Sequence, residues 1–327
     1  HGLYVFTING FPYGVFHGTR VKEQVYLPDW LDEERLAYTD GLARILAALL
    51  PAEPGLEGSV STVPGAYKAR VRGPGDVHRM AELLVRHAAT LHELRERTGK
   101  TIALALEPEP CCHLETIPEA IRFFRDHLFA PAAVATLGRL TGLGRADAEA
   151  ALRRHLGVCF DACHMAVEFE DVRGALTALQ AAGIRVPKIQ VSAGLRVRLD
   201  PRDHATVDAL RPFAEGVYLH QVVEARHGTL TRFLDLPEAL ATLSADAEPR
   251  EWRIHFHVPL FRQELGRFQN TQDYLRELLA LLGREPHTGH LEVETYTWDV
   301  LPEAYRKVDL SSAIARELNW VKAQLQQ

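Results

Sequence analysis

Short apolar runs alternate with longer amphipathic stretches along this chain. The runs with strand character are Leu3–Asn9, Ser59–Val63, Ile102–Glu107, Val158–Asp161, Lys188–Ser192, Arg253–Val258 and Leu291–Tyr296. The stretches with a helical period are Asp32–Leu50, Asp76–Thr98, Pro118–Leu128, Ala146–His155, Val172–Ala182, Thr271–Leu282 and Leu310–Leu325. Strands that alternate with helices in this way are typical of a parallel sheet covered by helices.

One segment departs from the alternation. Two extended runs, Val217–Glu224 and Leu230–Asp235, flank the sequence R-H-G-T, which predicts a β-hairpin outside the barrel wall. The seven remaining strands are one short of the eight in a TIM barrel. We therefore expect a single-domain (β/α)8 barrel over residues 1–327, whose first β-α unit is missing upstream of residue 1.

The alternation within each strand predicts which side chains face the barrel interior. In Ile102–Glu107 every second residue is apolar and is expected to pack against helices, which turns Glu107 inward. The same reasoning turns inward the polar residues Asp161, Gln190, His255, His257, Glu292 and Glu294. Most of them stand near the carboxyl ends of their strands, where barrel enzymes carry their active sites.

Several buried carboxylates in one place are very unfavourable unless a cation neutralises them or some stay protonated. A divalent metal is the simplest explanation, and oxygen donors mixed with imidazole suit Mn, Mg, Zn or Co. The alternative is a hydrogen-bonded polar layer, or ion pairs with Lys188 and Arg253.

The composition limits the classes of partner that this protein could bind. The formal net charge is −6, which disfavours nucleic acid, and no apolar run approaches the roughly 20 residues that span a bilayer. The four cysteines occupy two close groups, which disfavours a disulfide framework, and we find no signal peptide. We expect a cytoplasmic protein that binds a small-molecule metabolite, and the sequence leaves its oligomeric state open.

Three motifs resemble those of a known superfamily. E-P-E-P-C-C-H-L-E-T, from Glu107, resembles the E-P-x-N-R-x-E-T segment of ketose 3-epimerases, with two extra residues between the glutamates. G-V-C-F-D-A-C-H-M, from Gly157, and L-E-V-E-T-Y, from Leu291, resemble two further segments of these xylose-isomerase-like barrels. T-I-N-G-F-P-Y-G-V-F-H-G, followed by V-Y-L-P-D-W, resembles the metabolite traffic protein EboE family, whose members have a further β-α unit before this strand.

The resemblance implies roles for individual residues. Glu107 and Glu294 would be metal ligands and an acid/base pair, Asp161 would be a third ligand, and His164 and Glu115 would contact the substrate.

The chain departs from the epimerase pattern at Gln190, where relatives supply a ligand histidine. Either the amide of Gln190 ligates the metal more weakly, or His255 or His257 takes the place of the histidine. We expect His257 in the metal set with Gln190, and His255 at the substrate.

The resemblance thus implies a metal-dependent isomerase or epimerase of a small polyhydroxylated carbonyl compound, a sugar or sugar phosphate, that works through an enediolate. The alternative is a metabolite-binding or trafficking barrel of the EboE type without isomerase turnover. Metal-dependent phosphodiester cleavage is disfavoured by the acidic charge.

Overall fold

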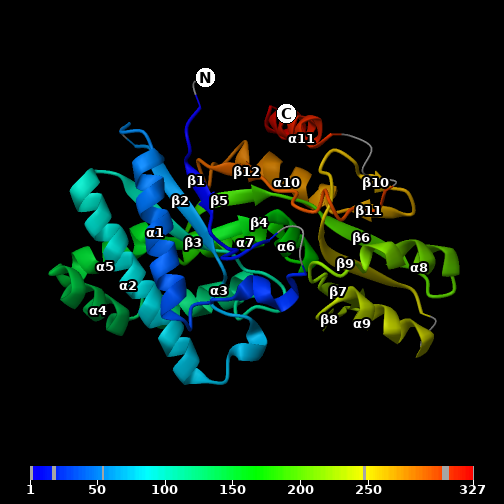
Figure 1. Cartoon of the computed structure of the whole chain (residues 1–327), viewed down its shortest axis with the longest axis horizontal. Helices are drawn as coiled ribbons and strands as arrows, with labels where there is room; N and C mark the ends of the chain where they lie inside the picture. The colour runs from blue at the N-terminus through cyan, green and yellow to red at the C-terminus, as the bar shows by residue number, and fades with distance from the viewer. Residues whose placement is uncertain (1–2, 17–19, 54, 246–247, 304–308, 327) are drawn as a thin grey trace.

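A six-stranded, all-parallel sheet forms the centre of the molecule (Figure 1). The computed structural model describes residues 3–16, 20–53, 55–245, 248–303 and 309–326. The sheet follows the order β1 (Thr7–Asn9), β2 (Glu57–Thr62), β3 (Thr101–Leu106), β4 (Leu156–Asp161), β5 (Arg185–Val191) and β12 (Leu291–Val293). Six of the seven predicted strands therefore lie in one parallel sheet.

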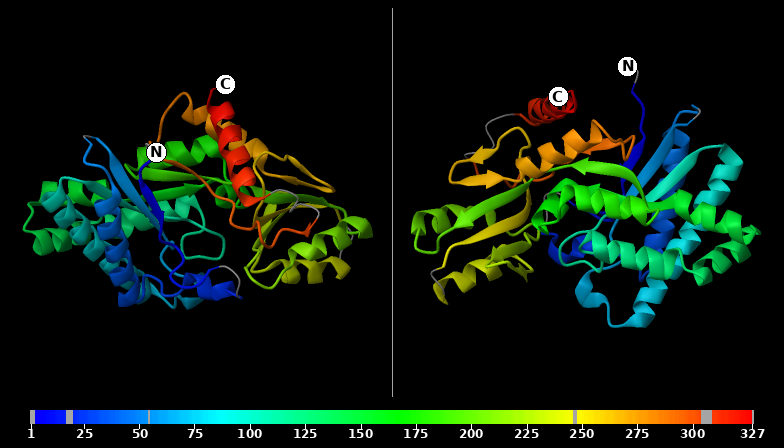
Figure 2. Two further views of the ribbon diagram at one scale, coloured as in Figure 1. Left: turned by 45° about the horizontal axis from the view of Figure 1, so that its top comes forward. Right: turned by 180° about the vertical axis from the view of Figure 1, so that it is seen from behind.

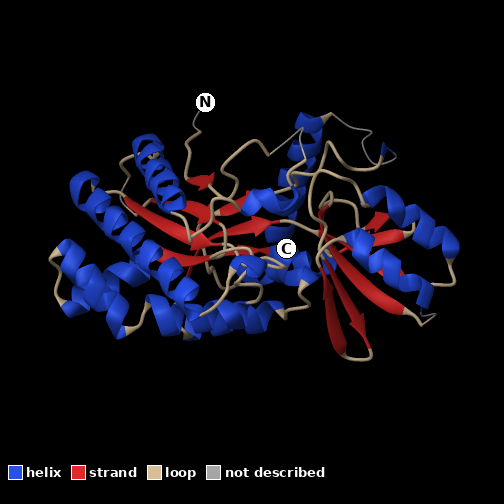
Figure 3. Ribbon diagram, turned by 60° about the horizontal axis from the view of Figure 1, so that its bottom comes forward, coloured by secondary structure: helices blue, strands red, loops and turns tan. Residues whose placement is uncertain are grey.

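Helices cover the outer face of this sheet (Figure 3). They are α1 (Glu33–Leu49), α2 (Pro74–Thr98), α3 (Ile117–Phe123), α4 (Pro131–Thr141), α5 (Arg145–His155), α7 (Val172–Ala181), α10 (Gln272–Leu282) and α11 (Leu310–Leu325). All seven predicted helices are confirmed, and α4 was not predicted. Local signals fix the ends: Thr116 and Glu119 form a capping box at the start of α3, and Gly99 ends α2 in the left-handed region with φ of 71°.

The predicted strand Arg253–Val258 is not part of the parallel sheet. It falls in β9 (Arg250–His257), which runs antiparallel between β6 (Gly194–Leu199) and β7 (Val222–Arg226). β6 follows β5 after two residues and pairs with β9 in the second sheet, and β12 takes the place beside β5, with Glu292 opposite Gln190. The prediction of seven parallel strands was therefore wrong by one, because alternation marks a strand but not its direction or its partner.

The second sheet lies to one side of the first (Figure 2) and has the order β10 (Glu264–Leu265), β11 (Phe268–Asn270), β6, β9, β7 and β8 (Thr229–Phe233). Helices α8 (His204–Leu210) and α9 (Leu236–Ala241) belong to this side of the molecule. The predicted hairpin is confirmed as β7 and β8, which pair antiparallel around His227 and Gly228, with φ of 49° and 78°. It lies outside the parallel sheet, as expected.

The parallel sheet is curled, so that its two edge strands approach each other. The Asn9 amide nitrogen donates to Glu294 Oε1 at 3.0 Å, and the rings of Phe6 and His290 lie 4.6 Å apart. The end of β9 joins the same place, because the Val258 N–H donates to the Ala193 carbonyl at 2.9 Å. The fold is thus α/β with a curled parallel sheet, and the expected unit upstream of residue 1 stays a prediction.

One buried apolar cluster runs through both sheets and includes Phe160 of β4 and Trp252 of β9. The interior of the curled sheet is polar by contrast: Lys188 is fully buried there, in an ion pair with Glu292. None of the described helices is both long enough and apolar enough to cross a membrane. The single-domain and cytoplasmic assignments stay predictions.

Candidate metal centre

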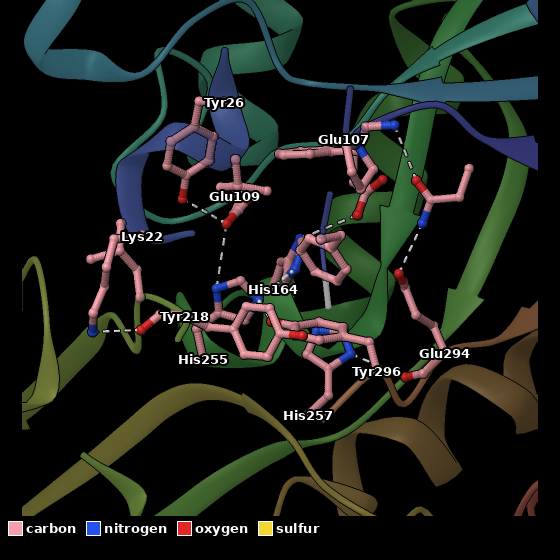
Figure 4. A pocket seen from close by; sticks show the side chains of 16 residues that line it. Lys22, Tyr26, Glu107, Glu109, His164, Tyr218, His255, His257, Glu294 and Tyr296 are labelled. Carbon is pink, nitrogen blue, oxygen red and sulfur yellow. Dashed lines mark hydrogen bonds and ion pairs between the residues drawn. The ribbon is translucent and has the colours of Figure 1, made fainter. Parts of the chain in front are cut away.

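Six polar side chains lie where the carboxyl ends of the parallel strands meet the end of β9, and all of them except Asp161 are drawn in Figure 4. Glu107 follows β3, Asp161 ends β4, His255 and His257 lie on β9, Glu294 follows β12, and His164 lies in the short helix α6 (Ala162–Val167). Glu107, Asp161, His164, His255 and His257 are buried, and Glu294 is half-buried. All but Asp161 line one cavity, and Asp161 lies beside His164 and His257. The inward faces predicted for these strand ends agree with this arrangement.

Each of the three histidines has its Nδ1 held by an oxygen. His164 Nδ1 lies 3.0 Å from the Pro108 carbonyl, and His257 Nδ1 lies 3.0 Å from the Glu294 carbonyl. His255 Nδ1 lies 2.8 Å from the Gln221 side-chain oxygen. These oxygens only accept hydrogen bonds, so each Nδ1 carries the proton and donates it. In the neutral rings, Nε2 is then the nitrogen with the free lone pair.

The orientation of the Gln221 amide is fixed by its other contacts. Its nitrogen donates to the Pro110 carbonyl at 3.2 Å and to the Tyr26 hydroxyl at 2.7 Å. Since the Pro110 carbonyl can only accept, the amide nitrogen must face it. The amide oxygen therefore faces His255, and the tautomer of His255 follows from the hydrogen-bond network.

The histidine nitrogens meet at one point. One ring nitrogen of each histidine lies within 4.8 Å of the other two, and the Nε2 atoms of His164 and His255 are 3.0 Å apart. Two lone pairs at that distance repel each other unless a cation or a proton lies between them. His257 Nε2 is buried without a hydrogen-bond partner. The three rings thus form a cradle for a positive charge.

The pKa shifts of the histidines agree with such a cradle. Burial lowers the pKa of His257 to about 4 and that of His255 well below its usual value. Burial acts in the same direction on His164, but the negative charges of Asp161, Glu109 and Glu107 outweigh it and raise the pKa. A proton on His164 Nε2, shared with His255, is therefore favoured in the metal-free protein, and a metal would displace it.

Each of the three carboxylates keeps one buried oxygen without a hydrogen-bond partner: Glu107 Oε2, Asp161 Oδ2 and Glu294 Oε2. Burial raises the pKa of Glu107 to about 8, and burial with the neighbouring carboxylates raises that of Glu294 well above its usual range. Burial also acts to raise the pKa of Asp161, but His164, His257 and two hydrogen bonds outweigh it and hold it low. Unpartnered buried oxygens of this kind are what a cation would satisfy.

The alternative of ion pairs with Lys188 and Arg253 does not account for these carboxylates. Lys188 pairs with Glu292, and Arg253 pairs with Glu251 at 2.9 Å and donates to the Ala166 carbonyl at 2.7 Å. A divalent cation fits the donor set, since three imidazole nitrogens and carboxylate oxygens suit Zn, Mn or Co.

Two residues singled out from the sequence do not line the cavity. Gln190 lies on β5, where its side-chain oxygen accepts a hydrogen bond from Cys159 Sγ at 3.0 Å. Glu115 does not line the cavity: its carboxylate pairs with Lys68 and accepts the Cys111 N–H at 2.7 Å.

Other residues of the cavity were not predicted. Glu109 lines the wall, where its Oε1 accepts from the Tyr26 hydroxyl at 2.9 Å (Figure 4). The only sequence signal for Glu109 is the second glutamate of E-P-E-P, which stands beyond the end of β3. Gln221 and Asn9 carried no signal of their own, because their roles depend on partners far away in the sequence.

Three aromatic rings pack together in the lining of the cavity. Phe16, Tyr218 and Tyr296 pack against one another with ring centroids 5.0–5.3 Å apart. The loop before α1 is held by the buried guanidinium of Arg35, which donates to the carbonyls of Gly10 and Phe11 at 2.8 and 3.0 Å.

Comparisons with known proteins give no family. No family model matches the chain, and a search of the curated proteins finds no match. Among solved structures, the chain is similar to the IolI protein with a bound zinc atom, at 14% sequence identity and a TM-score of 0.40 over 90% of this chain and 69% of that one. The resemblance to the EboE family stays a prediction, and we base the function on the geometry of the site.

Proposed function

We propose that this protein is a metal-dependent isomerase or epimerase of a small polyhydroxylated carbonyl compound. The observation that carries the proposal is the convergence of three histidine nitrogens, with carboxylate oxygens of Glu107 and Asp161 close to His164, beside a cavity that Glu294 also lines. Enzymes of this class need a divalent ion beside groups that move a carbon-bound proton, in a site that water enters poorly.

The proposed metal ligands come from His164, His255, His257, Glu107, Asp161 and Glu294. This set differs from the sequence-based expectation in that His164 and His255 become ligands rather than substrate contacts. We leave Gln190 out, because Cys159 already donates to its side-chain oxygen. A bound ion would polarise a substrate carbonyl and stabilise the negative charge that develops on its oxygen.

Glu107 and Glu294 are the proposed acid/base pair. Both line the cavity, and their raised pKa values let a carboxyl hold a proton near neutral pH and pass it on. Asn9 orients Glu294 by donating to its Oε1, which leaves Oε2 to face the cavity or the metal. One glutamate would remove the proton beside the carbonyl, and the other would return it.

The test measures carbon-bound proton exchange with deuterated water for a panel of ketoses, with protein loaded with Zn²⁺, Mn²⁺ or Co²⁺. Glu107→Gln keeps the size and one oxygen of the side chain but removes its basicity, so exchange should fall by about 10²–10⁴ while ligand affinity changes little. The matched control is Glu170→Gln, a half-buried carboxyl, which accepts the Ile117 N–H at 2.9 Å outside the cavity lining.

Metal-loaded protein that binds a member of the panel but exchanges no proton would contradict the isomerase proposal. It would leave the alternative, a metabolite-binding barrel without turnover. Equal losses of exchange in Glu107→Gln and Glu170→Gln would show a general effect of neutralising buried carboxyls and would also contradict the assigned role.

A further inference from the structure

The cavity contains a lysine whose N–H donors are all used by protein acceptors, so that none is left for a ligand. Among the described residues that line it, Lys22 is the one lysine or arginine. Its ammonium group donates to Asp235 Oδ2 at 2.6 Å, to the Tyr218 carbonyl at 2.6 Å and to the Glu215 carbonyl at 3.3 Å. An ammonium has three N–H donors, and three acceptors already use them. Asp235 also neutralises its charge.

The other polar groups of the wall mostly accept hydrogen bonds. Glu109 offers a carboxylate beside the Tyr26 hydroxyl, which itself donates to Glu109. The Nδ1 protons of His164, His255 and His257 are all engaged by protein oxygens. Beyond the metal position, the described lining therefore consists of carboxylates, tyrosine hydroxyls and aromatic faces, and it holds no lysine or arginine besides Lys22.

Such a lining treats two kinds of ligand differently. A hydroxyl group brings its own donor and can satisfy Glu109. A phosphate brings only acceptors and about −1.5 to −2 charge, and proteins usually meet it with arginine, lysine or helix N-termini. An anion that leaves water without such partners loses its solvation and gains little in return.

We propose that the cavity selects an uncharged polyhydroxylated substrate, with Glu109 accepting one of its hydroxyls, and discriminates against phosphorylated analogues. This inference rests on the proposed function and deepens it, since a sugar and a sugar phosphate are both polyhydroxylated carbonyl compounds. Glu109 becomes a substrate-binding residue, and the Lys22–Asp235 pair becomes the reason that a phosphate finds no partner.

The experiment compares matched pairs on Zn²⁺-loaded protein: D-fructose with D-fructose 6-phosphate, D-xylulose with D-xylulose 5-phosphate, and dihydroxyacetone with its phosphate. Binding is measured by calorimetry, and proton exchange with deuterated water is followed in the same samples. The uncharged member of at least one pair should bind at least about tenfold more tightly than its phosphorylated partner. Equal or tighter binding of the phosphorylated member in every pair that binds would overturn the inference.

Asp235→Asn tests the role of Lys22 directly. Asn keeps the oxygen that accepts the N–H groups of Leu236 and His220, and it caps helices as well as Asp, but it removes the counter-charge of Lys22. The variant should bind the phosphorylated member about 3–10-fold more tightly and leave the uncharged member unchanged. Asp203→Asn, at the cap of α8 and outside the cavity lining, is the matched control.

The outcomes separate the inference from the proposed function. Proton exchange into phosphorylated members alone would overturn the inference and leave the isomerase standing. Selective binding of uncharged members without any exchange would sink the isomerase and support the inference. No binding by any pair would overturn both. An unchanged binding ratio in Asp235→Asn, with uncharged binding intact, would overturn the explanation through Lys22.

Discussion

Replacing Gln221 with leucine is expected to weaken metal binding without removing a metal ligand. The Gln221 oxygen is the acceptor that holds the Nδ1 proton of His255 and so directs Nε2 toward His164. Leucine has a similar volume but no acceptor, so the proton of His255 is free to move to Nε2. The protonated nitrogen would then point at the place where the metal should bind.

The size of the effect follows from the contacts that are lost. Removing the hydrogen-bond partner of a metal-bound histidine typically costs 10- to 100-fold in metal affinity, or about 1.4–2.7 kcal/mol. Leucine also deprives Tyr26 and the Pro110 carbonyl of a donor. Each buried group left without a partner costs about 1–3 kcal/mol of folding free energy. The variant should therefore lose both metal affinity and stability.

A control separates the two losses. Gln272 is also buried, and its side chain donates to the Leu260 carbonyl and accepts from Arg276, away from the cavity. Gln272→Leu should lose stability but keep metal affinity. The assay is a Zn²⁺ competition titration against a chromophoric chelator, with denaturant unfolding measured in parallel. If the two variants bind Zn²⁺ equally well, Gln221 does not orient His255 for a metal.

Two further predictions concern buried charges outside the proposed ligands. Burial raises the pKa of Glu317 to about 7, so the folded protein keeps a proton that the unfolded chain releases, and stability should fall as pH rises from about 4.5 to 7. The effect of Glu317→Gln on the free energy of unfolding should therefore be more stabilising at pH 8 than at pH 5, by up to about 3 kcal/mol. An equal effect of the substitution at both pH values would contradict this. Glu292→Leu leaves the fully buried ammonium of Lys188 without its partner and should cost about 3–5 kcal/mol in urea unfolding. Lys188→Met should cost less, because Glu292 is 28% exposed and can be hydrated; equal losses would refute this reasoning.

The sequence predicted helices and parallel strands well because both depend on local periodicity. The prediction failed for strands whose sheet and direction depend on pairing with distant segments of the chain. β6 was missed although Leu195–Leu199 alternates apolar residues with arginines, which is the period of a strand. Arg196 is in fact buried, in an ion pair with Asp273 at 2.6 Å, a compensation that no local pattern reveals. The sequence also did not show that β9 runs antiparallel, because a local pattern does not give the direction of a strand or its partner.

The candidate site was predictable in part. Glu107, Asp161, His257 and Glu294 lie at strand ends, where alternation predicts their direction. Gln221 and Glu109 lie in irregular segments, and only the folded chain brings Glu109 to the cavity and Gln221 to His255.

The expected roles of His164 and His255 also depended on distant partners. The oxygens that fix their tautomers belong to Pro108 and Gln221, which are 56 and 34 residues away in the sequence. The resemblance to sugar epimerases supplied a substrate role for His164. The hydrogen bonds of the folded protein favour a ligand role instead.

The central claim is that three histidine Nε2 atoms and neighbouring carboxylates hold one divalent metal. Anomalous diffraction from crystals grown with Zn²⁺, measured on both sides of the zinc absorption edge, tests it most directly. We expect a single strong peak about 2.0–2.2 Å from Nε2 of His164, His255 and His257 and from at least one oxygen of Glu107, Asp161 or Glu294. No peak at this position, or a peak whose nearest ligands are other residues, would contradict the account.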